Sequence, residues 1–315
     1  MKILQLDEQW ISGIVKLWNR ELSVDFPMRD ALFKQNSIDD PNVLSSGSYL
    51  AINDQEQVIG FVLTKYVQDK TELLLNHEVG WIQALLVDSQ FRKSRIGSVL
   101  LESAEKALEQ QGCKTIFLGR DPAHYFPGVP LQYEHTREWF EKRGYQASGI
   151  ASDMMRTFTP DEKFDFQKPK DIEVSLIENK DELISFLHRC FPGRWEYEAK
   201  QYFKNGGTGR EFVVFRKENK IIGFCRINDS KSPIIGPNVY WAPLFDEGVG
   251  GVGPLGIDKE ERNKGYGLAI VKAGISFLRE RQLNNIIIDW TGLINFYKKI
   301  DFKVWKQYKQ YSKHI

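Results

Sequence analysis

The chain has 315 residues, of which 42% are hydrophobic and 27% charged, and its formal net charge is +1. This is the composition of a water-soluble globular protein with room for two domains. The balanced charge gives no reason to expect nucleic acid or an anionic membrane as a partner. No signal sequence or membrane-spanning run is visible, and the three cysteines are widely spaced. We therefore expect a cytoplasmic protein without disulfides or a bound metal.

Alternating strands and helices are predicted along the first half of the chain. In chain order these are a strand over 2–6, a helix from Trp10, a shorter helix over 28–39, strands over 48–53, 58–66 and 79–88, a helix ending at Gly112, a strand over 114–118 and a helix over 136–142. Residues 159–171 are charged, contain two prolines and show little periodicity. This composition is typical of a linker.

The same order of elements restarts after the linker. The segment VIGF at 58–61 returns as IIGF at 221–224, and Gly97 and Gly267 lie 170 residues apart in matching turns. Two landmarks at nearly one offset indicate a duplicated domain. The sequence predicts a first domain over 1–158 and a second over 172–315. Each is an α+β unit with a central, mostly antiparallel twisted sheet flanked by helices.

The turn over 262–267 is the feature of the second repeat that most clearly points to a ligand. It follows the apolar segment GPLGID, contains two cations and two glycines, and leads into a helix with an apolar stripe. Unpaired N–H groups at a helix start bind anions, and glycine lets a phosphate approach them closely. Neither a nucleotide P-loop nor a dinucleotide-binding glycine pattern is present.

Arg-x-x-Gly-x-Gly after a strand resembles the acyl-CoA signature of the GNAT superfamily of N-acetyltransferases. The segment INFYKKIDFKV resembles the family's tyrosine segment, with Tyr297 at the tyrosine position and Asp301 where glycine is usual, so a differently shaped helix end is expected. The blocks YWAPLF, GVGGVGPLGI and IDWTGLINFY are similar to the second half of tandem members such as mycothiol synthase. The resemblance implies two tandem GNAT domains.

The resemblance also implies acetyl-CoA as co-substrate and assigns its contacts. The residues expected to bind it are Leu255, Gly256, Ile257, Arg262, Asn263, Lys264, Gly265, Tyr266 and Gly267. Tyr297 is expected to protonate the leaving thiolate, although residue type alone also fits a core tyrosine. A general base is open among Asp246, Glu247 and Asp289, each of which also fits a solvated surface position, and Asp289 equally fits a helix-entry residue ahead of Thr291.

The first repeat resembles the second but differs at two positions that the chemistry needs. Arg92 and Gly97 are in register with the signature, whereas Arg95 replaces its first glycine and Phe140 replaces the tyrosine. We therefore expect a silent first repeat. The predicted function is transfer of an acetyl group to a primary amine of a small-molecule or peptide acceptor by the second repeat. The alternative is a non-catalytic protein that binds CoA or another partner.

Overall fold

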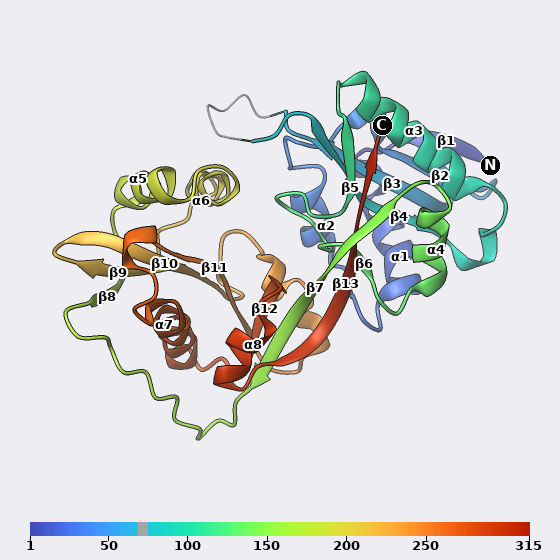
Figure 1. Ribbon diagram of the computed structural model, residues 1–315. Helices are drawn as coiled ribbons and strands as arrows, with labels where there is room; N and C mark the ends of the chain where they lie inside the picture. The colour runs from blue at the N-terminus through green and yellow to red at the C-terminus, as the bar shows by residue number, and fades with distance from the viewer. Residues whose placement is uncertain (69–74) are drawn as a thin grey trace. The chain divides into compact units, whose positions relative to one another are not determined.

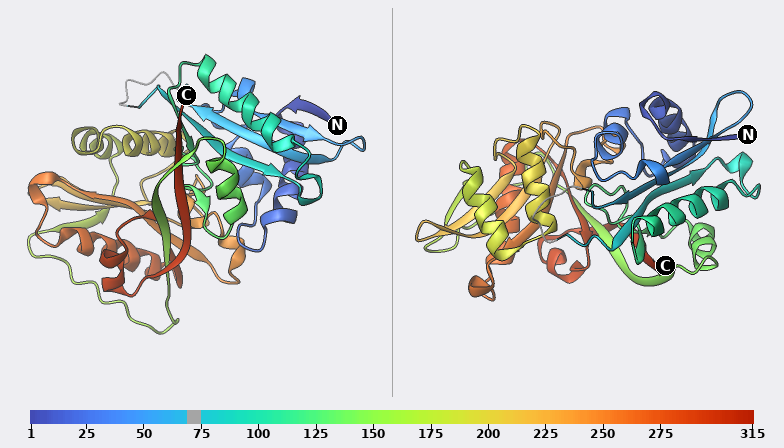
Figure 2. Two further views of the ribbon diagram at one scale, coloured as in Figure 1. Left: turned by 45° about the vertical axis from the view of Figure 1, so that its right-hand side comes forward. Right: turned by 90° about the horizontal axis from the view of Figure 1, so that it is seen from above.

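The computed structural model describes residues 1–68 and 75–315, which form two compact units. Unit 1 contains 1–68, Asn76–Ala151 and Gln307–Ile315, and unit 2 contains Ser152–Lys306. Figure 1 and Figure 2 show the elements from three directions. Residues 159–171 form neither helix nor strand. Their role as the boundary between two repeats, 1–158 and 172–315, stays a prediction.

Unit 1 is a sheet with helices on both faces. Its strands are β1 (Lys2–Gln5), β2 (Tyr49–Ile52), β3 (Val58–Tyr66), β4 (Val79–Val87), β5 (Thr115–Leu118) and the short β6 (Val129–Pro130), and its helices are α1 (Ile11–Leu22), α2 (Asp30–Asn36), α3 (Ile96–Gln110) and α4 (Glu134–Glu141). The strands are ordered β1-β2-β3-β4-β5, and β4 and β5 are parallel. Apolar side chains of α3 and α4 pack on one face, whereas Trp18 of α1 and Phe33 of α2 pack against Phe61 on the other.

Unit 2 repeats this architecture. Its strands are β8 (Glu173–Leu176), β9 (Phe212–Lys217), β10 (Lys220–Asn228), β11 (Val249–Ile257) and β12 (Asn285–Thr291), and its helices are α5 (Lys180–Cys190), α6 (Arg194–Lys204), α7 (Tyr266–Glu280) and α8 (Ile294–Tyr297). The order is β12-β11-β10-β9-β8, with β11 and β12 parallel. Helices α7 and α8 lie on one face of this sheet and α5 and α6 on the other (Figure 1), and an apolar cluster packs beneath each pair. The predicted fold class is confirmed.

Two long strands are shared between the units in a way that the sequence did not indicate. The second part of β7 (Gln146–Thr157) pairs with β12 in unit 2, from Ser152 opposite Thr291 to Thr157 opposite Asn285. The end of β13 (Lys303–His314) pairs with β5 in unit 1, and Tyr308 and Tyr311 are buried there. Each compact unit is therefore completed by a strand segment from the other repeat.

Candidate active site

The parallel strands β11 and β12 of unit 2 are paired over only part of their length and then diverge. Their pairing joins Val249–Gly251 to Asn285–Ile287. Further along β11, Leu255–Ile257 pair with Gly223–Cys225 of β10 on the other side. Within the described residues, β12 therefore supplies no ladder partner for Leu255, Gly256 or Ile257. Their free backbone edge is suited to a ligand that pairs like an added strand.

The predicted phosphate-binding turn has the required backbone. Asn263 and Gly265 have left-handed φ angles of 64° and 79°, and Gly265 is the N-cap of α7 without a side-chain hydrogen bond. Among the described residues, the first N–H groups of α7 thus have no side-chain cap, and a helix start leaves them without helical partners. Residues 262–265 are exposed, and a Cβ built on Gly265 meets no atom within 4 Å. This open, electropositive helix start fits a pyrophosphate.

The side chains around this turn have different roles. Arg262 donates from Nε to the carbonyl of Ile257 at 3.1 Å, which ties the turn to the end of β11. Lys264 is exposed and pairs with Glu261 at 2.8 Å. Tyr266 instead directs its ring toward the core, with its centroid 6.4 Å from that of Phe215. Gly267 lies beside Phe296, which a Cβ at this position would meet at 3.8 Å.

Tyr297 lies at the end of α8 and is 5% exposed. Its ring packs edge-on against Phe296 at 4.9 Å, and Phe302 lies 6.5 Å away. Burial raises the pKa of its hydroxyl, and the neighbouring Cys225 and Asp289 act in the same direction. In the described part of the chain the hydroxyl has no hydrogen-bond partner. It is therefore protonated at neutral pH and available to a ligand.

The helix end after Tyr297 corrects one expectation. Asp301 replaces the usual glycine, yet its φ of 62° and ψ of 19° place it in the left-handed region, as a C-terminal glycine would be. Aspartate is among the few residues that tolerate this conformation. The turn after α8 therefore keeps the usual shape, and the expected difference is wrong.

Of the three carboxylates considered as bases, Asp289 is the one held beside the diverging strands. Asp246 and Glu247 are exposed before β11, where Glu247 accepts a hydrogen bond from Asn284 at 2.9 Å. Asp289 is half-buried on β12, and its Oδ1 lies 3.6 Å from the Cβ position of Gly253 on β11. Burial and the nearby Asp153 raise its pKa to about 7. A carboxyl group with this pKa can exchange a proton at neutral pH.

A β-bulge sets the direction of Asp289. Ile288 pairs with Met154 and Thr291 with Ser152, so two residues of β12 face one residue of β7. Trp290 in this bulge has a φ of 39°, and its N–H donates to the carboxylate of Asp153 at 3.0 Å.

An asparagine in the loop before β11 holds the carboxylate from the other side. Asn238 donates to Asp289 at 3.0 Å and lies directly over Gly251, where any Cβ would be 1.9 Å from its Oδ1. Asp153 and Asn238 were not predicted from the sequence. Each is a single polar residue in a strand or loop, and its neighbouring residues do not indicate which distant residue it will bond.

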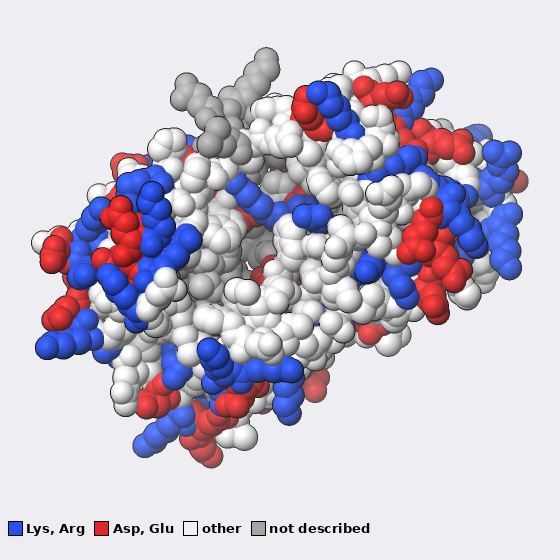
Figure 3. Space-filling view, in the orientation of Figure 1, with Lys and Arg blue, Asp and Glu red and all other residues white. Residues whose placement is uncertain are grey.

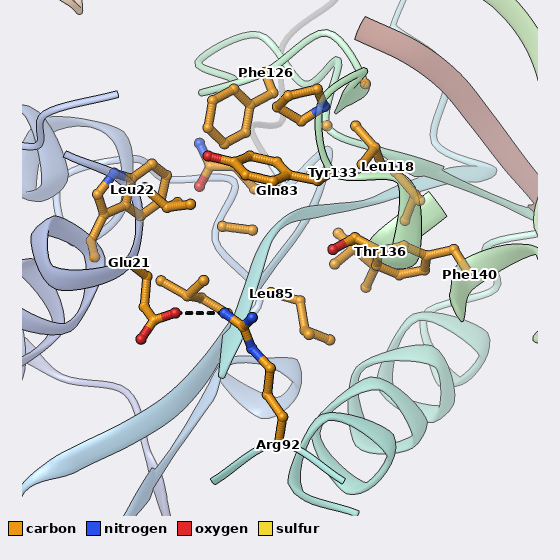
Figure 4. Close-up of a pocket in the computed structure, with 18 residues that line it drawn as sticks. Glu21, Leu22, Gln83, Leu85, Arg92, Leu118, Phe126, Tyr133, Thr136 and Phe140 are labelled. Carbon is orange, nitrogen blue, oxygen red and sulfur yellow. Dashed lines mark hydrogen bonds and ion pairs between the residues drawn. The ribbon is translucent and has the colours of Figure 1, made fainter. Parts of the chain in front are cut away.

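Unit 1 has the same turn with different side chains. Lys93 and Arg95 have φ angles of 64° and 65°, and Arg95 is the N-cap of α3 without a side-chain hydrogen bond. Arg92 donates from Nε to the carbonyl of Val87 at 3.1 Å, and its Nη2 pairs with Glu21 of α1 at 2.6 Å (Figure 4). Glu21 thus neutralises the arginine that would otherwise face an anion.

Behind Arg92, the diverging β4 and β5 of unit 1 border a cavity of about 220 Å³. Its labelled walls in Figure 4 are largely apolar or aromatic and include Leu85, Leu118, Phe126, Tyr133 and Phe140. Gly119, which lies 170 residues before Asp289, also lines it. The cavity therefore has Gly119 and Phe140 where unit 2 has Asp289 and Tyr297.

The family model of the acetyltransferase (GNAT) family matches the chain twice, over residues 11–127 and 180–302. These segments cover most of both repeats. The chain belongs to the acetyltransferase (GNAT) family, whose members are acetyl-CoA-dependent acyltransferases. The predicted family and the tandem arrangement are confirmed. A specific likeness to mycothiol synthase stays a prediction.

Solved structures share the tandem fold. A GCN5-related glucosamine N-acetyltransferase region of a fungal multi-domain GH3 beta-N-acetylglucosaminidase matches 99% of this chain with 23% identity and a TM-score of 0.85. The chain spans 38% of that longer protein. A GCN5-related N-acetyltransferase from Sphaerobacter thermophilus matches 99% of this chain and 95% of its own, with 13% identity and a TM-score of 0.72. A tandem GNAT protein from the clavulanic acid biosynthesis pathway matches 99% and 98%, with 12% identity and a TM-score of 0.69. At these identities the likeness concerns the fold.

The search of curated protein sequences gave no significant match. Across the described ranges 1–68 and 75–315, no helix has the length and apolar character needed to cross a membrane. The same residues contain no group of three or more His, Cys, Asp or Glu side chains that could hold a metal ion. Cationic and acidic side chains are interspersed on the face seen in Figure 3, in agreement with the net charge of +1.

Proposed function

We propose that the second repeat transfers an acetyl group from acetyl-CoA to a primary amine. The observation that carries this proposal is the meeting of three features where β11 leaves β12: a free strand edge at Leu255–Ile257, the open helix start at Gly265, and the pair Asp289 and Tyr297. Family membership supports acetyl transfer in general, and these three features support the second repeat as its proposed location.

The proposed contacts follow the chemistry of the co-substrate. Acetyl-CoA supplies an acyl thioester that is already activated toward attack by an amine. The backbone of Leu255–Ile257 would pair with the pantetheine arm, and the N–H groups that start α7 would bind the pyrophosphate. Arg262, Asn263 and Lys264 would surround this anion, and the absent side chain at Gly265 would leave space for it. Tyr266 and Gly267 would hold the first turn of α7 in place.

The two titratable groups then divide the proton transfers. Asp289 accepts a proton from the acceptor amine as its nitrogen bonds to the acyl carbon. Tyr297 donates its proton to sulfur as the carbon–sulfur bond breaks, so the products are an amide and a thiol. Asp289 loses its proton to solvent and Tyr297 regains one. Burial raises the pKa of the Tyr297 hydroxyl, so the group carries the proton that this role requires.

The acceptor is proposed from a relative alone. One structure with the same tandem fold is named for glucosamine N-acetylation. We therefore propose a small molecule with a primary amine as the acceptor and an amino sugar as the first class to test. Peptide amines form the second class.

A thiol-release assay with purified protein tests this function. Acetyl-CoA is mixed with a panel containing glucosamine, other amino sugars, polyamines and short peptides, and products are checked by mass spectrometry for one added acetyl group. We expect at least one amine to accelerate thiol release and to become acetylated. Binding of acetyl-CoA with no acetylation across the panel would instead favour the non-catalytic CoA-binding alternative.

A further inference from the structure

The bulge that carries Asp289 depends on a residue from the other repeat. Asp153 belongs to β7, the last strand of the first repeat, but its segment of that strand is part of unit 2. The carboxylate of Asp153 accepts the hydrogen bond of the Trp290 N–H at 3.0 Å, next to Asp289 in the chain. Asp153 is 5% exposed, so water screens its charge poorly.

Several groups from different elements act on Asp289. Asp153 comes from β7, Glu198 and Arg194 come from α6, and Tyr297 comes from α8. Glu198 is itself paired with Arg194 at 2.6 Å, so these two charges largely offset each other. Asn238 contributes a neutral hydrogen bond. Asp153 is accordingly the main charged neighbour that favours the protonated form of Asp289.

We propose that Asp153 is a positioning residue for the base of the second repeat: the hydrogen bond it accepts from the Trp290 N–H fixes the bulge that aims Asp289, and it holds a negative charge beside that base. This inference rests on the proposed role of Asp289. It also gives the first repeat a part in the reaction that requires no chemistry of its own.

The variant Asp153→Asn separates the two effects. Its amide oxygen can still accept the Trp290 N–H, whereas the charge is lost. The acidic limb of the kcat/KM profile should then move to lower pH by about one unit, a size that a single nearby charge commonly produces. Asp153→Glu keeps the charge and should keep the limb near pH 7. The matched control is Asp161→Asn, at an exposed position between β7 and β8, which should leave the profile unchanged.

A second measurement, an NMR titration, does not depend on turnover. NMR of protein labelled at the aspartate carboxyl carbon, with Asp289 assigned from the Asp289→Asn variant, gives the titration midpoint of Asp289 directly. We expect a midpoint near 7 in the wild type and a lower one in folded Asp153→Asn. An unchanged midpoint in that variant, together with an inactive Asp289→Asn, would overturn the role of Asp153 and leave the proposed function standing. A fully active Asp289→Asn would overturn the base itself.

Discussion

The phosphate-binding turns of the two repeats have nearly the same backbone and opposite chemical surroundings. Arg95 and Gly265 are both left-handed N-caps, with φ angles of 65° and 79°. Arg92 and Arg262 each donate from Nε to a strand carbonyl at 3.1 Å. Because these contacts hold the turn to its strand, they are needed for the fold in either repeat. Their preservation therefore indicates common architecture and says little about catalysis.

The difference between the repeats lies in a few side chains. Arg92 is neutralised by Glu21, whereas Arg262 has no acidic partner among the described residues. Gly119 replaces the proposed base, and a Cβ there would lie 2.0 Å from the carbonyl oxygen of Phe126. Position 119 thus cannot hold an aspartate without moving the backbone. The comparison teaches that the first repeat can keep its fold while losing the groups that the reaction requires.

Removing the proposed base is one of the two largest expected effects. Asp289→Asn keeps the size of the side chain and its hydrogen bond to Asn238, so it should lower kcat/KM by about 10²–10⁴-fold. In the wild type, kcat/KM should rise tenfold per pH unit below about 7 and level off above it, because the base acts in its ionised form. A steady-state pH profile of both proteins checks this, and wild-type activity in the variant would contradict it.

The protonation of Asp289 should also make the free energy of unfolding depend on pH. Its pKa of about 7 in the folded protein exceeds the value of about 3.9 expected when unfolded, so the folded state binds the proton more tightly. This contribution to stability is present below pH 4 and is lost as the pH rises to 7. In denaturant titrations, the free energy of unfolding should therefore fall less between pH 4 and pH 7 in Asp289→Asn than in the wild type.

The proposed acid gives the next test and has a counterpart in the first repeat. Tyr297→Phe keeps the ring contacts with Phe296 and Phe302, so kcat should fall by about 10²–10⁴-fold while CoA affinity stays nearly unchanged. Phe140→Tyr adds a hydroxyl beside the cavity of unit 1 and should leave activity as it is. Measuring kcat for both variants with the thiol-release assay compares the two positions. Equal losses in both would remove the predicted asymmetry.

The smallest effect concerns the turn of the first repeat. A non-glycine residue in the left-handed region costs roughly 1–2 kcal/mol, so Arg95→Gly should relieve part of this strain. Glycine also gives the unfolded chain more freedom, which opposes the gain. We expect a net stabilisation of about 0.5–1 kcal/mol in denaturant titrations and no gain of activity. A clear destabilisation would mean that the Arg95 side chain contributes a stabilising contact.

Much of the fold and part of the candidate site could be predicted because their signals are local. Apolar periodicity and the glycines at 97, 265 and 267 indicated the repeated strand, turn and helix, and the family resemblance added Tyr297. The exchange of β7 and β13 could not be predicted, because local periodicity does not specify which distant strand becomes a partner. Asp289 was one of three open candidates. Its half-buried place in the bulge, the hydrogen bond from Asn238 and the nearby charge of Asp153 distinguish it from the exposed Asp246 and Glu247.

Calorimetric titration of CoA tests the central claim most directly, namely that the second repeat holds the co-substrate site. The wild type should bind one CoA per chain. Gly265→Glu places a bulky anion at the open helix start and should abolish binding. The matched control is Gly206→Glu after α6, because Gly206 also has a left-handed φ of 88° and open space around its Cβ position. That control should still bind one CoA. Two equal sites in the wild type, or full binding by Gly265→Glu, would contradict the claim.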